Sequence, residues 1–188
     1  EEALAYPVQT STITVPSALC CTDDWLYIFN ADRTTAGTLS GYNLVKGNTE
    51  TLATNAQAGE QQGFDYGYTA NGLVYWTAGD GVYQLDINAR NTAFTAGASS
   101  TQNVAMASQL GLTAGKQGAG VIVYNGVVLY AYDKGVVRFD KNNPASLKGT
   151  ILSEFTIRCM ALDRVSQKLY FTTQEGLYVA TLNGEYPV

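Results

Sequence analysis

The alternation of apolar and polar positions along the chain predicts pairs of short β-strands joined by tight turns. The clearest pair lies in residues 125–140, NGVVLYAYDKGVVRFD. Residues 127–132 are predicted as one strand, Asp133-Lys134-Gly135 as the turn and residues 136–140 as the next strand. Because so few residues join the two strands, they must pair antiparallel.

The same pattern recurs along the chain, which makes it a repeat. It is found as GLVYWTAGDGVYQLD at residues 72–86 and as KLYFTTQEGLYVATL at residues 168–182. A looser copy starts with WLYIFN at Trp25 and resumes with GYNLV at Gly41, after a polar loop expected over residues 30–40. The chain is therefore predicted to be a tandem array of β-meanders.

The spacing of the repeats indicates the architecture. The tyrosine of the second strand recurs 48, 55 and 40 residues apart, as Tyr27, Tyr75, Tyr130 and Tyr170. Repeats of about 40–50 residues with four short strands are typical of β-propellers, whose blades bury their faces by packing around an axis. We expect an all-β fold, a β-propeller of four-stranded antiparallel blades with four repeats visible.

All 188 residues are expected to form one domain, because no change in composition divides the chain. Residues 1–10 would supply an outer strand, and the blades are placed at residues 11–56, 63–98, 118–154 and 156–188. The outer strand of the second blade is expected around residues 92–95. Residues 97–117 are predicted to be an inserted loop, in which residues 104–110 have the apolar spacing of one or two helical turns.

The two ends of the chain carry similar segments, AYPV at residues 5–8 and EYPV at residues 185–188. Either the N-terminal strand completes the last blade and closes a four-bladed ring, or the chain is a segment of a larger propeller. The closed ring is preferred, because a stable chain should not leave blade edges open. In a closed ring, Cys159 would lie near Cys20 and Cys21.

Composition supports a sheet protein and narrows its partners. The chain is 46% hydrophobic and only 14% charged, with 13 Tyr and 19 Gly, a mixture that suits strands and turns. Its net charge of -5 and the lack of a basic stripe make nucleic acid an unexpected partner. No apolar run has the length of a membrane span, and the start Glu-Glu-Ala indicates a processed product or a segment of a longer chain. Low charge with Thr-rich strands favours an extracellular or cell-surface location.

The three cysteines, Cys20, Cys21 and Cys159, leave three alternatives open. They are buried thiols, or one bridge joins Cys20 or Cys21 to Cys159, or a strained bridge joins the adjacent Cys20 and Cys21.

Two of the repeats resemble the YWTD propeller blades of the LDL-receptor family. The resemblance covers ALDRVSQKLYFTTQEGLYVATLNG at residues 161–184 and LVYWTAGDGVYQLDIN at residues 73–88, where Tyr75, Trp76 and Thr77 match the family motif. Ala78 replaces the aspartate of the motif, and the family has six blades where this chain shows four. The resemblance implies an extracellular interaction module.

The chain contains no histidine, which bears on catalysis. Ser-His-Asp and Cys-His nucleophile systems and imidazole base catalysis are thereby excluded. The sequence carries no phosphate-binding loop and no recognisable metal-ligand spacing, so no catalytic residue, cofactor or metal site is predicted. A non-enzymatic role is favoured, without enzymatic activity being excluded.

Carboxylates and aromatic side chains remain as candidates for ligand binding. The ligand-binding candidates are Asp65, Tyr68, Trp76 and Asp133. Aspartates in turns ordinarily accept hydrogen bonds from their own backbone, and aromatic residues in propellers ordinarily pack between blades, so each candidate also has a structural explanation.

Three functions follow from this pattern. The first is a non-enzymatic extracellular binding or assembly module with a protein or glycan partner. The second is a carbohydrate-binding or carbohydrate-active propeller that uses Asp and Tyr side chains near the axis. The third is a structural subunit of an extracellular fibre or coat, which would self-associate through open blade edges.

Overall fold

The computed structural model describes residues 16–21, 24–30, 37–56, 73–78, 81–86, 102–116, 118–124, 126–146 and 149–182. Within these ranges the chain forms fourteen strands and one short 3-10 helix, grouped into four antiparallel sheets. The strands of each sheet follow one another in chain order, so every sheet is a meander. The all-β fold class is thereby confirmed.

The first sheet has four strands: β1 (Pro16–Cys21), β2 (Trp25–Asn30), β3 (Gly37–Asn43) and β4 (Asn48–Ala56). The second sheet has three described strands: β5 (Leu73–Ala78), β6 (Gly81–Asp86) and β7 (Gln102–Met106). The helix η1 (Ala107–Leu110) follows β7 directly.

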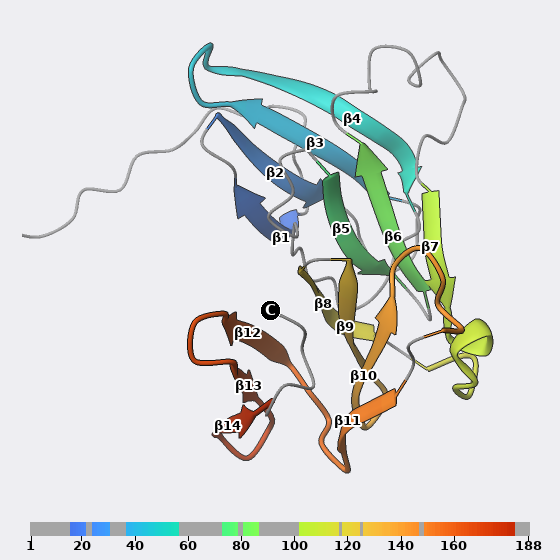
Figure 1. Ribbon diagram of the computed structural model, residues 1–188. Helices are drawn as coiled ribbons and strands as arrows, with labels where there is room; N and C mark the ends of the chain where they lie inside the picture. The colour runs from blue at the N-terminus through green and yellow to red at the C-terminus, as the bar shows by residue number, and fades with distance from the viewer. Residues whose placement is uncertain are drawn as a thin grey trace, which may run out of the picture.

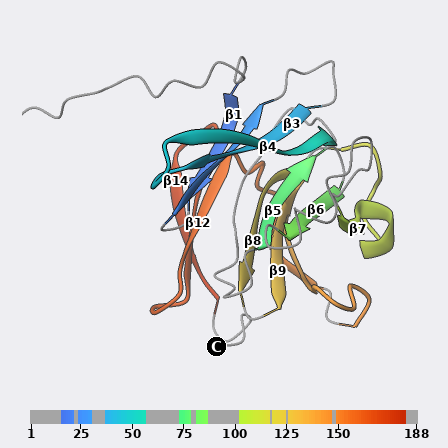
Figure 2. The ribbon, with the colours of Figure 1, turned by 90° about the horizontal axis from the view of Figure 1, so that it is seen from above.

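The third sheet has four strands: β8 (Gly118–Tyr124), β9 (Val127–Tyr132), β10 (Gly135–Asp140) and β11 (Gly149–Ser153). The fourth has three described strands: β12 (Cys159–Asp163), β13 (Lys168–Thr172) and β14 (Leu177–Thr181). Figure 1 shows the sheets following one another around an arc, from the first sheet at the top to the fourth at the lower left. Seen from above in Figure 2, η1 lies at the outer side of the second sheet, beside β7.

The predicted meanders are confirmed, with two corrections to the loops. Residues 37–40 belong to β3, and residues 38–40 pair with β2, so the polar loop expected over residues 30–40 is shorter than predicted. Gln102–Met106 is β7, which pairs with β6, so the expected irregular insertion is wrong for this part of residues 97–117. The helical turn expected in this region is present as η1, while the strand expected around residues 92–95 lies outside the described residues.

The strand β9 explains how the third sheet is built. All six of its residues are buried, which matches a continuous apolar run rather than an alternating one. Val128, Tyr130 and Tyr132 pack into a core shared with the second sheet. Val127, Leu129 and Ala131 pack into a core shared with the fourth sheet. The third sheet is therefore covered on both faces, in agreement with contacts of β8 to both β5 and β12.

The tyrosine that recurs in the second strand of each repeat has a different environment in the last sheet. Tyr27, Tyr75 and Tyr130 are 2%, 0% and 0% exposed, whereas Tyr170 is 39% exposed. Tyr170 lies on the face of the fourth sheet opposite to the core shared with the third sheet, and its cross-strand partners Ala161 and Val179 are also exposed. No helix in the described part of the chain has the length and apolar character needed to cross a membrane.

Candidate functional site

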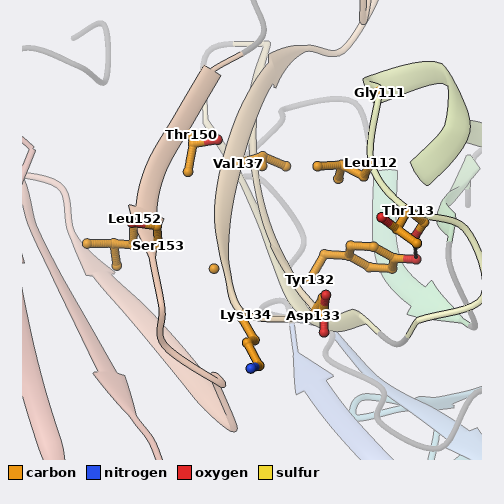
Figure 3. A pocket seen from close by; sticks show the side chains of 11 residues that line it. Gly111, Leu112, Thr113, Tyr132, Asp133, Lys134, Val137, Thr150, Leu152 and Ser153 are labelled. Atoms are coloured by element: carbon orange, nitrogen blue, oxygen red, sulfur yellow. Dashed lines mark hydrogen bonds between the residues drawn. The ribbon is translucent and has the colours of Figure 1, made fainter.

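The third sheet carries a surface cavity of about 250 Å³, drawn in Figure 3. Its walls come from the segment after η1, the turn between β9 and β10, and the strands β10 and β11. Leu112 and Val137 point toward one another across it. The other lining residues are Gly111, Thr113, Tyr132, Asp133, Lys134, Gly135, Thr150, Leu152 and Ser153.

A second cavity of about 150 Å³ adjoins the first and shares three of its lining residues, Leu112, Val137 and Thr150. It adds Leu110, Arg138 and Gly149 to the lining. We call the surface that these two cavities line along β10 and β11 the β10 groove. Its apolar lining includes Leu112 and Val137, and the exposed residues Thr113, Asp133, Lys134 and Thr150 add hydroxyl and charged groups.

The segment after η1 forms one wall of the β10 groove and is held by Tyr132. The Tyr132 hydroxyl donates a hydrogen bond of 2.7 Å to the carbonyl of Thr113 and accepts one of 3.0 Å from the N–H of Lys116. Gly111 ends η1 in the left-handed region with φ 74°, which a glycine adopts without strain. The wall is therefore fixed to β9 rather than hanging free over the cavity.

The turn between β9 and β10 closes one end of the groove. Asp133 is exposed and has φ 50°, a left-handed conformation that aspartate tolerates better than most residues. Of the predicted ligand-binding residues, Asp133 is the one that the structure places in this cavity. Lys134, beside it, is also exposed and also lines the cavity.

The other predicted ligand-binding residues lie elsewhere. Trp76 is 0% exposed, and its ring stacks on Tyr83 with a centroid distance of 5.9 Å, so it packs in the protein interior. Trp76 is not among the residues that line the β10 groove. Asp65 and Tyr68 lie outside the described residues, and their role in binding stays a prediction.

Aspartates in turns have the structural role expected of them. The Asp140 carboxylate accepts hydrogen bonds of 2.8 and 2.9 Å from the N–H groups of Asn142 and Asn143. Asp163 accepts hydrogen bonds from the Ser166 hydroxyl and from the N–H groups of Ser166 and Val165. These bonds, chiefly the one from the Ser166 hydroxyl, hold the pKa of Asp163 below its ordinary value. Both carboxylates therefore serve the turns.

The cysteines that the structure describes are not buried. Cys21 and Cys159 are free and exposed, which corrects the expectation of buried thiols at these two positions and leaves them unbridged to each other in this structure. The side chain of Cys20 lies outside the described residues. Pairing in an oxidising medium stays a prediction, which the intact mass with and without reductant checks.

Sequence reasoning missed most of the groove. Leu112, Thr113, Arg138 and Thr150 carried no motif, because they come together only when β10, β11 and the segment after η1 are packed. The long insertion after the second blade was the one available signal, since long loops on a rigid scaffold often carry binding residues. No group of three or more His, Cys, Asp or Glu side chains that could hold a metal occurs in the part of the chain that the structure describes.

Comparison with solved structures defines the class of fold. The structure of a nidogen–laminin complex matches with a TM-score of 0.68 at 10% identity, over 93% of this chain and 62% of the matched chain. A gluconolactonase from Xanthomonas campestris matches with a TM-score of 0.66 at 15% identity, over 95% of this chain and 61% of that enzyme. The extracellular domain of a one-component system protein from B. thetaiotaomicron matches with a TM-score of 0.59 at 12% identity, over 100% of this chain and 22% of that one.

These matches show a β-propeller fold. The chain spans about three fifths of the length of the first two matched chains, at 62% and 61%. No protein-family model matches the sequence, and no curated protein matches it. Because one fold carries many functions, function must be argued from the site.

Proposed function

We propose that this chain is a non-enzymatic binding module of the β-propeller type, which holds a protein partner in the β10 groove at an extracellular or cell-surface location. The observation that carries the proposal is the groove itself, in which Leu112 and Val137 face one another beside hydroxyl and charged side chains. Ligand sites in proteins typically combine a concave apolar surface with a few polar groups that orient the ligand.

Two further observations support a binding role. The groove lining contains no cysteine and the chain contains no histidine, so neither a Ser-His nor a Cys-His nucleophile pair can form in it. One matched structure is a complex of nidogen with laminin and another is an extracellular domain, which supports a protein partner and an extracellular location. The resemblance of two repeats to YWTD blades points the same way.

The test fills the groove with a larger side chain. Thr150 is exposed on β11 and lines both cavities, so Thr150→Arg would block the groove. Thr51 is an exposed threonine on β4, the outer strand of the first sheet, and Thr51→Arg is the matched control. Random peptides displayed on phage are selected on the wild-type protein. We expect the selected peptides to bind the Thr51→Arg variant and to lose at least about tenfold in affinity for Thr150→Arg.

Two results would count against the proposal. Selected peptides that bind both variants equally would place the binding site elsewhere. A glycan array that yields binding while no peptide is selected would favour the carbohydrate-binding alternative.

An enzymatic role is the second candidate, and the match to a gluconolactonase is the observation that favours it. In that role Asp65 and Tyr68 would act near the axis. Hydrolysis of a sugar lactone by the wild-type protein, lost in Asp65→Asn and retained in Asp133→Asn, would establish it in place of the binding role. Self-association through open blade edges stays a prediction, which light scattering checks.

A further inference from the structure

The strand β14 has a single neighbour among the described strands. The first and third sheets have four strands each, and in the third sheet β11 lies outside β10. In the fourth sheet no described strand lies outside β14, which Figure 1 shows at the far end of the arc, beyond β13. None of the five residues of β14 is buried, whereas Val136 and Phe139 of β10 are both 0% exposed. Within the described part of the chain, β14 is therefore an open edge.

The hydrogen bonds between β13 and β14 show which backbone groups point to this edge. Just after β14, the N–H of Leu182 donates a hydrogen bond of 2.9 Å to the carbonyl of Gln167. Hydrogen-bonded pairs alternate with non-hydrogen-bonded pairs along an antiparallel ladder, so the even-numbered residues of β14 bond to β13. The N–H and C=O groups of Leu177, Val179 and Thr181 therefore point to the open edge.

The strand β14 lacks the features that usually protect an open edge. It contains no charged residue and no proline, and its five pairs with β13 follow one another without a register shift. The outer strands of the other three sheets, β4, β7 and β11, each pair with their neighbour through a register shift. Such irregularities, like charge and proline, keep the edges of sheets from pairing with other chains. Among the described outer strands, β14 is therefore the one best suited to accept another strand.

The sequence of β14 suits pairing with a second copy of itself. An antiparallel pair centred on Val179 places Val179 opposite Val179 of the second copy, and Leu177 opposite Thr181. These are the residues whose N–H and C=O groups point outward, so the opposed residues can exchange backbone hydrogen bonds. On the other face of the strand, Tyr178 lies opposite Ala180, a large side chain beside a small one. We infer that two copies of this chain associate by this antiparallel pairing of β14, which joins their fourth sheets into one.

The exposed apolar side chains of β14 add to the association. Leu177 and Val179 are 73% and 55% exposed, and the pairing gives each of them a cross-strand neighbour on the same face. A contact through one strand buries less than the about 800 Å² per partner of a standard interface, so the association is weak and depends on concentration. It is independent of the β10 groove, which lies along the third sheet, so either can fail without the other.

Sedimentation velocity of the full chain over a range of concentrations tests the pairing. We expect the wild-type protein to pass from monomer to dimer as its concentration rises. Val179→Lys and Val179→Glu each place like charges opposite one another at the centre of the pair, so each should raise the dissociation constant at least about fivefold. An equimolar mixture of the two variants should restore the dimer, because lysine then lies opposite glutamate.

The matched controls are Val165→Lys and Val165→Glu. Val165 is 96% exposed and lies in the turn between β12 and β13, away from the edge of β14. These variants carry the same changes in net charge and should dimerise like the wild type, alone and in mixture. A wild-type protein that stays monomeric at every concentration would overturn the inference. So would a dimer that the Val179 variants form as readily as the wild type, or a mixture of them that dimerises no better than either variant alone.

Amide exchange on the wild-type protein decides the inference even if the Val179 variants fail to fold. The N–H groups of Leu177, Val179 and Thr181 should exchange more slowly as the protein concentration rises. Protection of these groups that does not change with concentration would show that a segment of the same chain covers the edge, and the inference would be wrong.

Discussion

At the scale of single residues, Gly135 is required by the close approach of β11 and not by the conformation of the turn. The predicted turn Asp133-Lys134-Gly135 would ordinarily use glycine for its freedom in φ, yet Asp133 is the residue with the positive φ. Gly135 instead begins β10, where it pairs with both Tyr132 and Ser153. A Cβ placed on Gly135 would run into the backbone carbonyl oxygen of Leu152. The glycine is needed because β11 approaches too closely for any side chain.

This close approach leads to a prediction on stability. Gly135→Ala should destabilise the protein by about 1–3 kcal/mol, because the obstructing atom is backbone and the strand pair must shift to admit the methyl group. Gly149→Ala, in the partner strand, is the matched control. Its Cβ would meet nothing nearer than the Arg138 Nε at 3.8 Å, so it should be neutral or stabilising by up to about 1 kcal/mol. Urea unfolding of both variants measures the difference, and equal effects would contradict this explanation.

At the scale of elements, the segment from β7 to Lys116 combines a strand, a helix and a wall of the groove. Its sequence, with Gln102 and Asn103 before Val104, carries little strand signal, and β7 forms because β6 offers it an unpaired edge. The N–H of Met106 donates a hydrogen bond of 2.7 Å to the Gln109 side chain, which helps to start η1 directly after the strand. The element is therefore defined by its neighbours more than by its own residues.

The attachment of this segment to β9 can be tested at Tyr132. Tyr132→Phe removes the hydrogen bonds to Thr113 and Lys116, and should cost about 1–2 kcal/mol of stability. Amide exchange should become faster in residues 111–116 and stay unchanged in β9 and β10. Tyr178→Phe is the control, because the Tyr178 hydroxyl makes only a long, exposed contact of 3.4 Å with Glu175. Unchanged exchange in residues 111–116 would show that Tyr132 does not hold this wall.

At the scale of the whole molecule, the third sheet packs between the second and the fourth and shares a core with each. The fourth sheet packs Leu169 and Phe171 into the core shared with the third sheet. Its other face carries Tyr170, Leu177 and Val179, which are 39%, 73% and 55% exposed. The outermost face of a row of packed sheets stays exposed unless another element packs on it. This outer face of the fourth sheet carries apolar side chains, as the buried faces of the neighbouring sheets do.

A pair of leucines in the fourth sheet tests this difference between its faces. Leu169→Ala should cost about 2–5 kcal/mol, because Leu169 is 0% exposed and its loss leaves a cavity in the core. Leu177→Ala, on the exposed face of the same sheet, should change stability by less than about 0.5 kcal/mol. Urea unfolding of the two variants gives the comparison. A cost of several kcal/mol for Leu177→Ala would mean that this face is covered in solution.

The repeated meanders could be predicted from the sequence because the determinants of strands and tight turns are local. Alternation over a few residues and a short connection are enough to define an antiparallel pair, and Val127–Tyr132 shows this clearly, since its apolar run was predicted to within a residue. The spacing of Tyr27, Tyr75, Tyr130 and Tyr170 was likewise enough to indicate blades. Asp133 was selected as a candidate for its carboxylate and lines the groove, while its role in binding stays a prediction.

The tertiary structure alone decided which distant segments meet. Residues 102–106 become a strand only because the edge of β6 is open to them, and Trp76 is removed from any binding surface because it packs in the interior. Tyr170 is more exposed than its three counterparts, although it too lies in the second strand of its repeat. The groove between β10, β11 and the segment after η1 also depends on long-range packing. Which segments meet there is decided by which surfaces are left uncovered, and not by local residue preference.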